Sequence, residues 1–291
     1  MALRRVDLGH GIGLRTAHFG RFLEERPPVA WVEAISENFM AAGGRPLAVL
    51  EKVRRDVPVA LHGVSLAVGS LDPIPERYLD DLASLVRRIE PALVTDHLCW
   101  GRHRGRYLHD LLPLPCTEEA LEHVASRVRQ VQERLGRQIL LENPSTYVAY
   151  READMPEWAF LAEVARRADC GILLDVNNVH VSAHNLGFDP LAYLDGLPAA
   201  RVGQLHLAGH ADRGRFLLDT HDAPVADAVW ALYGEALRRY GRVPTLVEWD
   251  DRIPPLEVLV AESRKAAALE EGLLRPAPGA RPHPQREAAA P

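Results

Sequence analysis

The segment VGQLHLAGHADRGRFLLDTHD, residues 202–222, places ionisable side chains directly after two apolar runs. His206 and His210 follow the first run, and Asp219 and His221 follow the second. Burying such groups costs several kcal/mol unless each of them finds a partner. We therefore expect these side chains to lie in a shared polar site, for which a metal ion is a suitable partner.

Histidines and acids also stand at the ends of the other short apolar runs. They are His62, Asp96, His97, Glu142, Asp175 and Glu248. One such residue alone is more often a helix N-cap, a salt-bridge partner or a hydrogen-bonded core residue than a ligand. Acids gathered in one place would repel one another, however, and no Lys or Arg stands beside these positions in the sequence. We therefore expect metal ions to neutralise them, and mixed imidazole and carboxylate ligands suit Fe, Mn or Zn.

The number of candidate ligands indicates more than one metal ion. The candidates are His62, His97, His206, His221, Glu142, Asp175, Asp219 and Glu248. They exceed the three or four protein ligands of a mononuclear site. A carboxylate such as Glu142 or Asp175 can bridge two ions, so the sequence predicts a multinuclear centre.

Short apolar runs alternate with segments of helical spacing along the chain. The runs are residues 11–14, 31–35, 57–62, 92–97, 138–143, 171–176, 202–207 and 244–249, and the helical segments include 45–56, 78–89, 117–136, 157–168 and 227–241. This alternation predicts βαβ units, and eight units in about 270 residues match a (β/α)8 TIM barrel. The C-terminal strand ends of that barrel form one rim, where the polar residues would meet. A doubly wound open sheet is the alternative, but no Gly-rich dinucleotide fingerprint follows an early strand.

Composition bounds the class of protein and its surroundings. The chain has 291 residues, with 47% hydrophobic and 25% charged residues, as is ordinary for a soluble globular protein. The net charge of −6 argues against a nucleic-acid partner. Cys99, Cys116 and Cys170 are too few and too widely spaced for a disulfide framework or a zinc ribbon, which fits a reducing cytoplasm. Neither a signal peptide nor a membrane span is apparent, so we expect a cytoplasmic protein without a membrane partner.

The chain is expected to hold one domain and a tail. Residues 1–272 carry the pattern of the barrel. Residues 273–291 are rich in Pro and Ala without apolar periodicity, which is typical of a disordered segment.

Long motifs, in order along the chain, closely resemble the multinuclear non-haem iron-dependent oxidative enzymes. The motifs are GIGLR, WVEAISENFM, LHGVSLAVGS, HDLLPLPCTEEAL, LLENPSTY, LLDVNNVHVSAHNLGFDP, LHLAGH, DTHDAPV and VEWD. The resemblance implies a TIM barrel with two to three irons, Fe(II) and Fe(III) mixed, and O2 as co-substrate. It implies oxidative modification of cysteines in a ribosomally synthesised precursor peptide. It also implies a small partner protein that recruits this peptide and forms a heterodimer with the enzyme.

The resemblance also implies which residues hold each iron. The first iron would be held by His62, His97 and Glu142, the second by Glu142, Asp175, His206 and Glu248, and the third by Asn178, Asp219 and His221. Asn178 stands where some members have a histidine, and Asn is a poorer ligand, so His180 or His184 could compensate. The further residues expected at the rim, to hydrogen-bond a ligand or to orient the peptide, are His210, Asn143, Asn38 and Arg15.

Two other functions remain open on the same residues. The first is a zinc- or manganese-dependent isomerase or endonuclease of the xylose-isomerase-like kind, whose barrels also carry His, Asp and Glu at strand ends. An enzyme that acts on DNA should show a basic rim, and the acidic balance of the chain speaks against this. The second is a non-catalytic metal-binding or scaffold protein. The identity of the metal and O2 consumption distinguish the three.

Overall fold

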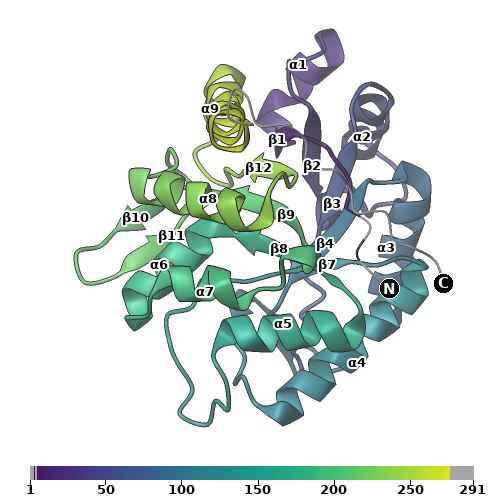
Figure 1. Ribbon diagram of the computed structural model, residues 1–291. Helices are drawn as coiled ribbons and strands as arrows, with labels where there is room; N and C mark the ends of the chain where they lie inside the picture. The colour runs from purple at the N-terminus through teal and green to yellow at the C-terminus, as the bar shows by residue number, and fades with distance from the viewer. Residues whose placement is uncertain (1–2, 4, 276–291) are drawn as a thin grey trace, which may run out of the picture.

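The computed structural model describes residue 3 and residues 5–275, which form a closed parallel β-barrel surrounded by helices (Figure 1). The barrel strands are β1 (His10–Gly13), β2 (Trp31–Ile35), β3 (Val59–His62), β4 (Leu93–His97), β7 (Leu140–Glu142), β8 (Gly171–Asp175), β9 (Val202–Leu207) and β12 (Thr245–Val247). Each strand pairs in parallel with the next, and β1 closes the barrel by pairing with both β2 and β12. The predicted (β/α)8 fold is therefore confirmed, and each apolar run predicted as a strand forms one.

Helices cover the outside of the barrel (Figure 1). They are α1 (Phe19–Glu24), α2 (Arg45–Asp56), α3 (Glu76–Ile89), α4 (Glu118–Leu135), α5 (Glu157–Ala168), α6 (Val176–Leu186), α7 (Pro190–Gly196), α8 (Asp227–Tyr240) and α9 (Leu256–Leu274), with short 3-10 segments at Thr16–His18, Ser36–Phe39 and Ala199–Arg201. At the start of α4 the Thr117 side chain accepts a hydrogen bond from the Ala120 backbone N–H, and Gly136 ends the helix with φ of 65°. These are the start and stop that the sequence predicts there.

The end of α9 bears on the predicted domain boundary. This helix continues to Leu274, past the boundary expected at residue 272. The rest of the predicted tail, residues 276–291, lies outside the described residues. The disorder predicted for that segment therefore stays a prediction.

The interior of the barrel is built in layers by the two-residue period of the strands. A cluster of buried apolar side chains fills one layer, and it consists of Trp31, Ala60, Leu93, Leu140, Leu173 and Leu246. Their neighbours in the sequence, such as Val32 and Leu141, belong to the larger core between barrel and helices. The residues two positions beyond the inner layer are Glu33, His62, Thr95, Glu142, Asp175 and Glu248. The polar layer therefore lies on the same inner face, one step closer to the C-terminal rim.

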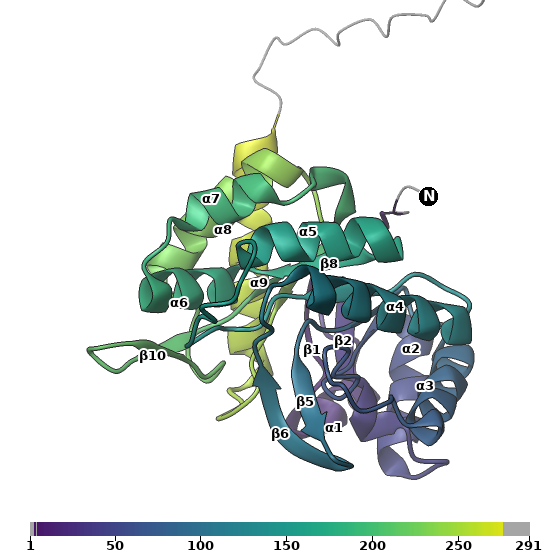
Figure 2. The same ribbon diagram turned by 90° about the horizontal axis from the view of Figure 1, so that it is seen from below.

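Two hairpins that the sequence did not predict extend the rim. The first follows β4 and consists of β5 (Trp100–His103) and β6 (Arg106–Leu112), and the second follows β9 and consists of β10 (His210–Asp212) and β11 (Leu217–Asp219). Figure 2 shows both on the same side of the barrel. Because each hairpin follows the C-terminal end of a barrel strand, both stand over the polar layer.

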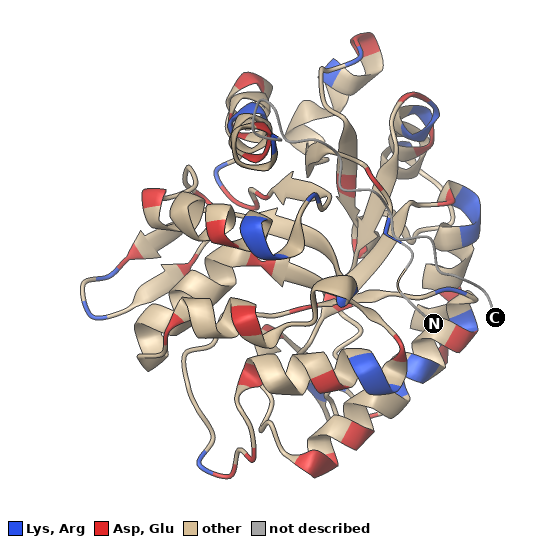
Figure 3. Ribbon diagram, in the orientation of Figure 1, with Lys and Arg blue, Asp and Glu red and all other residues tan. Residues whose placement is uncertain are grey.

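The surface carries charges of both signs. Figure 3 shows acidic and basic residues interspersed over the outer helices. No helix in the described part of the chain is long and apolar enough to cross a membrane.

Candidate metal centre

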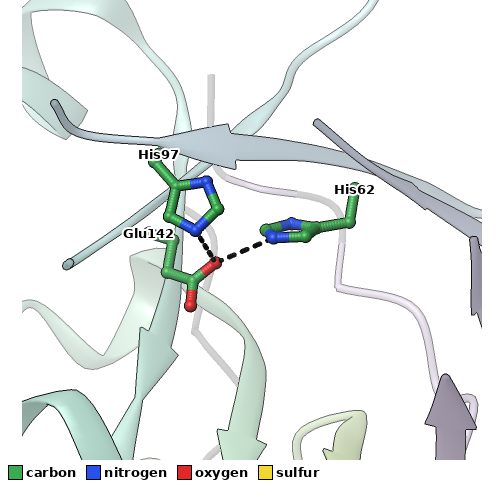
Figure 4. Close-up of side chains that lie close together, drawn as sticks. All are labelled: His62, His97 and Glu142. Carbon is green, nitrogen blue, oxygen red and sulfur yellow. Dashed lines mark ion pairs between the residues drawn. The ribbon is translucent and has the colours of Figure 1, made fainter. Parts of the chain in front are cut away.

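The first group of candidate ligands, His62, His97 and Glu142, lies at the ends of adjacent strands β3, β4 and β7. The Nε2 atoms of both histidines point at one carboxylate oxygen, Glu142 Oε2, at 3.3 and 3.4 Å (Figure 4). His97 Nδ1 lies 3.1 Å from the Gly63 carbonyl oxygen and His62 Nδ1 lies 2.7 Å from Thr95 Oγ1. Because a carbonyl only accepts, the neutral His97 ring is protonated on Nδ1 and keeps the Nε2 lone pair for a ligand.

The second group shares Glu142 and adds Asp175, His206 and Glu248, all buried. One donor atom of each lies within 4.8 Å of the others. His206 Nδ1 is 3.0 Å from Glu248 Oε2 and 3.6 Å from Glu142 Oε1. Asp175 Oδ1 caps α6 by accepting from the Asn178 backbone N–H at 2.6 Å, which leaves Oδ2 without a hydrogen-bond partner. These contacts leave Glu142 in a position to bridge two ions.

Glu33 was not among the predicted ligands, yet it fixes the orientation of His206. Glu33 Oε1 lies 3.1 Å from His206 Nε2, and Gln204 Nε2 donates to Glu33 Oε2 at 2.6 Å. When an ion is held by the second group, the ring can direct its Nε2–H to Glu33 and its Nδ1 lone pair to that ion. The signal in the sequence is the two-residue period of β2, which puts Glu33 on the same inner face as Trp31.

Electrostatics of the second group call for a cation. Although burial alone lowers it, the carboxylates of Glu33, Glu248 and Glu142 hold the pKa of His206 well above its usual value. Burial raises the pKa of Asp175 well above its usual value. Without a metal ion, His206 and Asp175 therefore stay protonated to a higher pH than usual. A bound metal ion would supply the positive charge in place of these protons.

The third group surrounds His221. Its Nε2 lies 2.6 Å from Asp219 Oδ1, and its Nδ1 lies 3.1 Å from Asp250 Oδ2 and 3.4 Å from Glu248 Oε2. His221, Glu248 and Asp250 each offer one donor atom within 4.8 Å of the others. Asp250 was not among the predicted ligands, although it stands two residues after Glu248 in the sequence. The structure thus brings His221 and Asp219 together as expected and adds Asp250 to them.

Asn178, predicted as a ligand of the third iron, has both ends of its amide paired. Its Oδ1 accepts from Ser145 Oγ at 2.9 Å, and its Nδ2 donates to the Asn143 carbonyl oxygen at 3.1 Å. The Asn143 side chain in turn exchanges two hydrogen bonds with the backbone of Asp175, at 2.9 and 3.0 Å. Asn143 therefore braces the end of β8, and Asn178 lies in the wall of the site.

Two of the residues expected around the ligands, His210 and Arg15, support the acids of the third group. His210 Nδ1 lies 2.7 Å from Asn177 Oδ1, and Asn177 Nδ2 donates to Asp219 Oδ1 at 2.8 Å. Arg15 donates to the Trp249 carbonyl oxygen at 2.8 Å and forms an ion pair with Asp250. His210 and Arg15 therefore hold the acids beside His221 in place.

Three other residues lie away from the centre. Asn38 is exposed in the 3-10 segment Ser36–Phe39 and does not line the cavity that opens above the candidate ligands. His180 and His184, considered as replacements for Asn178, are not among the lining residues either, and His180 packs against His210. The structure therefore gives none of the three a contact with the candidate ligands.

The three cysteines are buried and free, and none lines the cavity. Burial raises the pKa of Cys99 well above its usual value, and burial raises the pKa of Cys116 and of Cys170 to about 12. Thiols in this state are poor ligands, since a metal binds the thiolate.

A cavity of about 260 Å³ opens above the candidate ligands. It is lined by Ile35, His62, Val64, His97, Asp110, Leu111, Pro144, Ser145, Tyr147, Asn178, Asp219, Thr220, His221, Glu248 and Asp250. The two hairpins supply part of this wall, through β6 and β11. A small molecule or an extended peptide side chain can therefore reach the ligand groups from outside.

The donor atoms fit metal ions. Glu142 Oε2 and Asp175 Oδ2 are buried, and within the described residues neither atom accepts a hydrogen bond. Such atoms are costly unless an ion satisfies them. The donor set contains imidazole nitrogens and carboxylate oxygens without thiolates, which suits Fe, Mn or Zn.

Solved structures with this architecture include endonuclease IV from Thermus thermophilus and a D-tagatose 3-epimerase-like protein. The first has a TM-score of 0.60 and 16% identity over 92% of this chain and 100% of its own. The second has a TM-score of 0.60 and 15% identity over 90% of this chain and 97% of its own. At such identities the likeness shows the fold alone.

Sequence relatives are much more similar. The chain is 69% identical over 274 residues to a UPF0276 protein of Anaeromyxobacter sp. (strain Fw109-5), covering 94% of this chain and 97% of the relative. It is 52% identical over 258 residues to a UPF0276 protein of Acaryochloris marina (strain MBIC 11017), covering 89% and 93%. Residues 9–271 match a family that modifies the precursors of ribosomally synthesised and post-translationally modified peptides (RiPPs), which confirms the resemblance seen in the motifs. The chain belongs to the family of RiPP precursor modification enzymes MbnB/TglH/ChrH.

Proposed function

We propose that the chain is an oxidase that binds two to three iron ions and uses O2 to modify cysteine residues of a ribosomally synthesised precursor peptide. One observation carries the proposal. Glu142 belongs to two groups of buried imidazoles and carboxylates at the floor of one open cavity. Membership of a family of RiPP precursor modification enzymes supports a peptide as the substrate.

Each ligand group has a role in this proposal. His62, His97 and Glu142 would hold the first ion, Glu142, Asp175, His206 and Glu248 the second, and His221, Asp219, Asp250 and Glu248 the third. When bound, the irons would supply the redox chemistry with O2. Glu142 and Glu248 would bridge neighbouring ions, which reduces the repulsion between the ions as well as between the acids.

The cavity fits a thiol that comes from outside the chain. The protein's own cysteines are buried with raised pKa values, so they do not compete for the ions. A cysteine on an extended peptide could enter between the hairpin strand β6 and the loop at Tyr147, which both line the opening. The metal ions would favour its thiolate form.

The lining speaks against the isomerase or endonuclease alternative for phosphate-bearing substrates. Among the described residues that line the cavity, Asp110, Asp219, Glu248 and Asp250 are acidic and none is Lys or Arg. Phosphate recognition relies on such cations. A neutral sugar remains chemically possible, and the metal decides between the two.

The test is to measure the metal content and absorption of the purified protein and then its O2 uptake with a cysteine-containing precursor peptide. We expect two to three irons per chain, colour on oxidation, and a mass change confined to the cysteine. A peptide with Ser in place of Cys should give no mass change. Stoichiometric zinc without colour or O2 uptake would instead favour an isomerase.

A matched pair of variants tests the shared carboxylate. Glu142→Gln should lose iron and the reaction together, because two ions depend on that residue. Glu157→Gln changes a half-buried glutamate that pairs with Thr146 and Tyr193 outside the centre. It should keep its iron. Equal iron content in both variants would count against the assignment of Glu142.

We also propose that a small partner protein delivers the peptide and forms a heterodimer with the chain. Exposed apolar side chains stand around the rim: Leu108 on β6, Tyr147 and Val148 on the loop after β7, and Phe216 between β10 and β11. Apolar side chains exposed together are typical of contact surfaces. Addition of the partner should lower the KM for the precursor and give a heterodimer in size-exclusion chromatography, and Val148→Glu should weaken both effects.

A further inference from the structure

Three histidines form a separate cluster outside the cavity. His180 and His184 lie on α6, and His210 begins β10. None of them lines the cavity, and none belongs to the three ligand groups described above. The cluster therefore needs an explanation of its own.

The geometry brings the three imidazoles onto one patch. His180 and His184 are one helical turn apart, which places their Cβ atoms about 5–6 Å from each other. The His180 and His210 rings pack with their centroids 5.1 Å apart. Burial lowers the pKa of His180 and of His210, and the charge of His184 lowers both further. A pair of histidines at this helical spacing can bind one metal ion, and His210 adds a third nitrogen from the neighbouring hairpin.

Hydrogen bonds prepare His210 for such a role. Asn177 donates through Nδ2 to the Asp219 carboxylate, so its Oδ1 faces His210 Nδ1 at 2.7 Å. Nδ1 of the neutral ring therefore carries the proton, and the Nε2 lone pair is available to a ligand. A backbone carbonyl or an acid often plays the part of Asn177 for histidines that bind metals.

We propose that His180, His184 and His210 form a peripheral binding site for a divalent transition-metal ion, separate from the centre in the barrel. An all-imidazole site suits borderline ions such as Ni²⁺, Zn²⁺ or Cu²⁺. The donor atoms of the three rings do not yet lie within 4.8 Å of one another. His184 is exposed, and rotation of its side chain closes the site around the ion. This histidine site does not depend on the proposed peptide oxidation.

The test is to add Ni²⁺ to the iron-loaded protein. Equilibrium dialysis with elemental analysis should show one tightly bound Ni²⁺ per chain while the iron content stays constant. Anomalous scattering at the nickel edge should locate it beside α6. His184→Asn should weaken Ni²⁺ binding at least about tenfold, since even loss of a ligand's hydrogen-bond partner has an effect of that size, and leave the iron content unchanged.

A control variant excludes unspecific binding to surface histidines. His103→Asn removes an exposed histidine from the other hairpin and should leave Ni²⁺ affinity as in the wild type. Because His184 is exposed, its substitution should not disturb folding, so the result does not depend on a damaged variant. Unchanged affinity in His184→Asn, nickel located elsewhere, or displacement of iron by nickel would each overturn the proposal. None of these results depends on the proposed peptide oxidation.

Discussion

At the scale of single residues, the candidate ligands His62, His97 and His206 each have one ring nitrogen held by a residue outside the ligand groups. The Gly63 carbonyl oxygen faces Nδ1 of His97, and Glu33 faces Nε2 of His206. Partners of this kind set the tautomer and the direction of the ring, and they raise the basicity of the ligand. The binding properties of the centre therefore depend on residues that never touch an ion.

Glu33→Gln tests this dependence. The substitution removes the negative charge beside His206 but keeps a polar side chain of nearly the same shape, so we expect the fold to persist. Affinity for the second ion should fall about 10- to 100-fold, as when partners of metal ligands are removed. The affinity is measured by competition with a coloured chelator, and the absorption band of the oxidised protein should shift. The Glu157→Gln variant is the control, and equal affinity in both variants would contradict the role of Glu33.

At the scale of elements, the barrel strands do two jobs with alternate residues. One face of each strand packs against the helices, and the other face builds the inner layers. The inner apolar layer needs a close approach at Gly11, where a Cβ would lie 2.6 Å from the Trp31 ring. The Trp31 indole in turn donates to the Gly9 carbonyl oxygen at 3.1 Å. The small residue in β1 thus lets the large residue in β2 form the floor below the polar layer.

Gly11→Ala should destabilise the fold because Trp31 has to move. Overpacking of this kind costs about 1–3 kcal/mol. The free energy of unfolding is measured by denaturant titration of the metal-free protein. Gly20→Ala is the control, since nothing lies within 4 Å of a Cβ at that position in α1. Gly20→Ala should be neutral or stabilise the protein, and equal loss of stability in both variants would contradict the steric argument.

At the scale of the whole molecule, the two ends of the barrel are specialised differently. The C-terminal rim gathers the candidate ligands, and the opposite end is closed by contacts between distant segments. There His10 of β1 lies 3.2 Å from the Tyr233 hydroxyl of α8 and 3.8 Å from the Glu270 carboxylate of α9. The rim is thus available for chemistry, while the other end holds the first strand to the last helices.

Because His10 is largely buried, we expect the free energy of unfolding to fall in acid. Burial, together with the charge of Arg242, lowers its pKa from 6.5 to about 4, although Asp7 opposes this shift. Between pH 6.5 and about 4, His10 is therefore protonated in the unfolded chain but mostly neutral in the folded protein. The free energy of unfolding should fall with decreasing pH in this window, by up to about 1.4 kcal/mol per pH unit. Denaturant titration at pH 7 and pH 5 should show a smaller fall for His10→Gln, whereas His103→Gln should behave as the wild type.

Metal removal should destabilise the whole barrel. Ions that bind only the folded state stabilise it by mass action, by about 4 kcal/mol when the free ion exceeds the dissociation constant a thousandfold. We expect the Tm of the iron-loaded protein to fall on chelation and to recover when iron is returned, as followed by calorimetry. In Glu142→Gln the same treatment should shift the Tm less. A Tm that does not respond to chelation in the wild type would speak against ions bound in the core.

The sequence by itself determined the fold class and most of the candidate centre. Apolar runs that alternate with helical segments require parallel strands, and the C-terminal ends of parallel strands in a barrel meet at one rim. The residues at the ends of these runs, such as His62 and Glu142, could therefore be named without coordinates. Long motifs identified the family, because their order and length leave little room for coincidence.

Only the tertiary structure decided which partners these residues meet. Glu33 and His206 are far apart in the chain and come together because the barrel closes across its interior. The short hairpin strands carry no regular apolar alternation, so the sequence did not reveal that β10 brings His210 against His180. The same reason explains Asn178, whose amide is paired by Ser145 and Asn143 from a neighbouring strand end. Strand ends follow from local pattern, whereas contacts across the barrel depend on how the strands close around it.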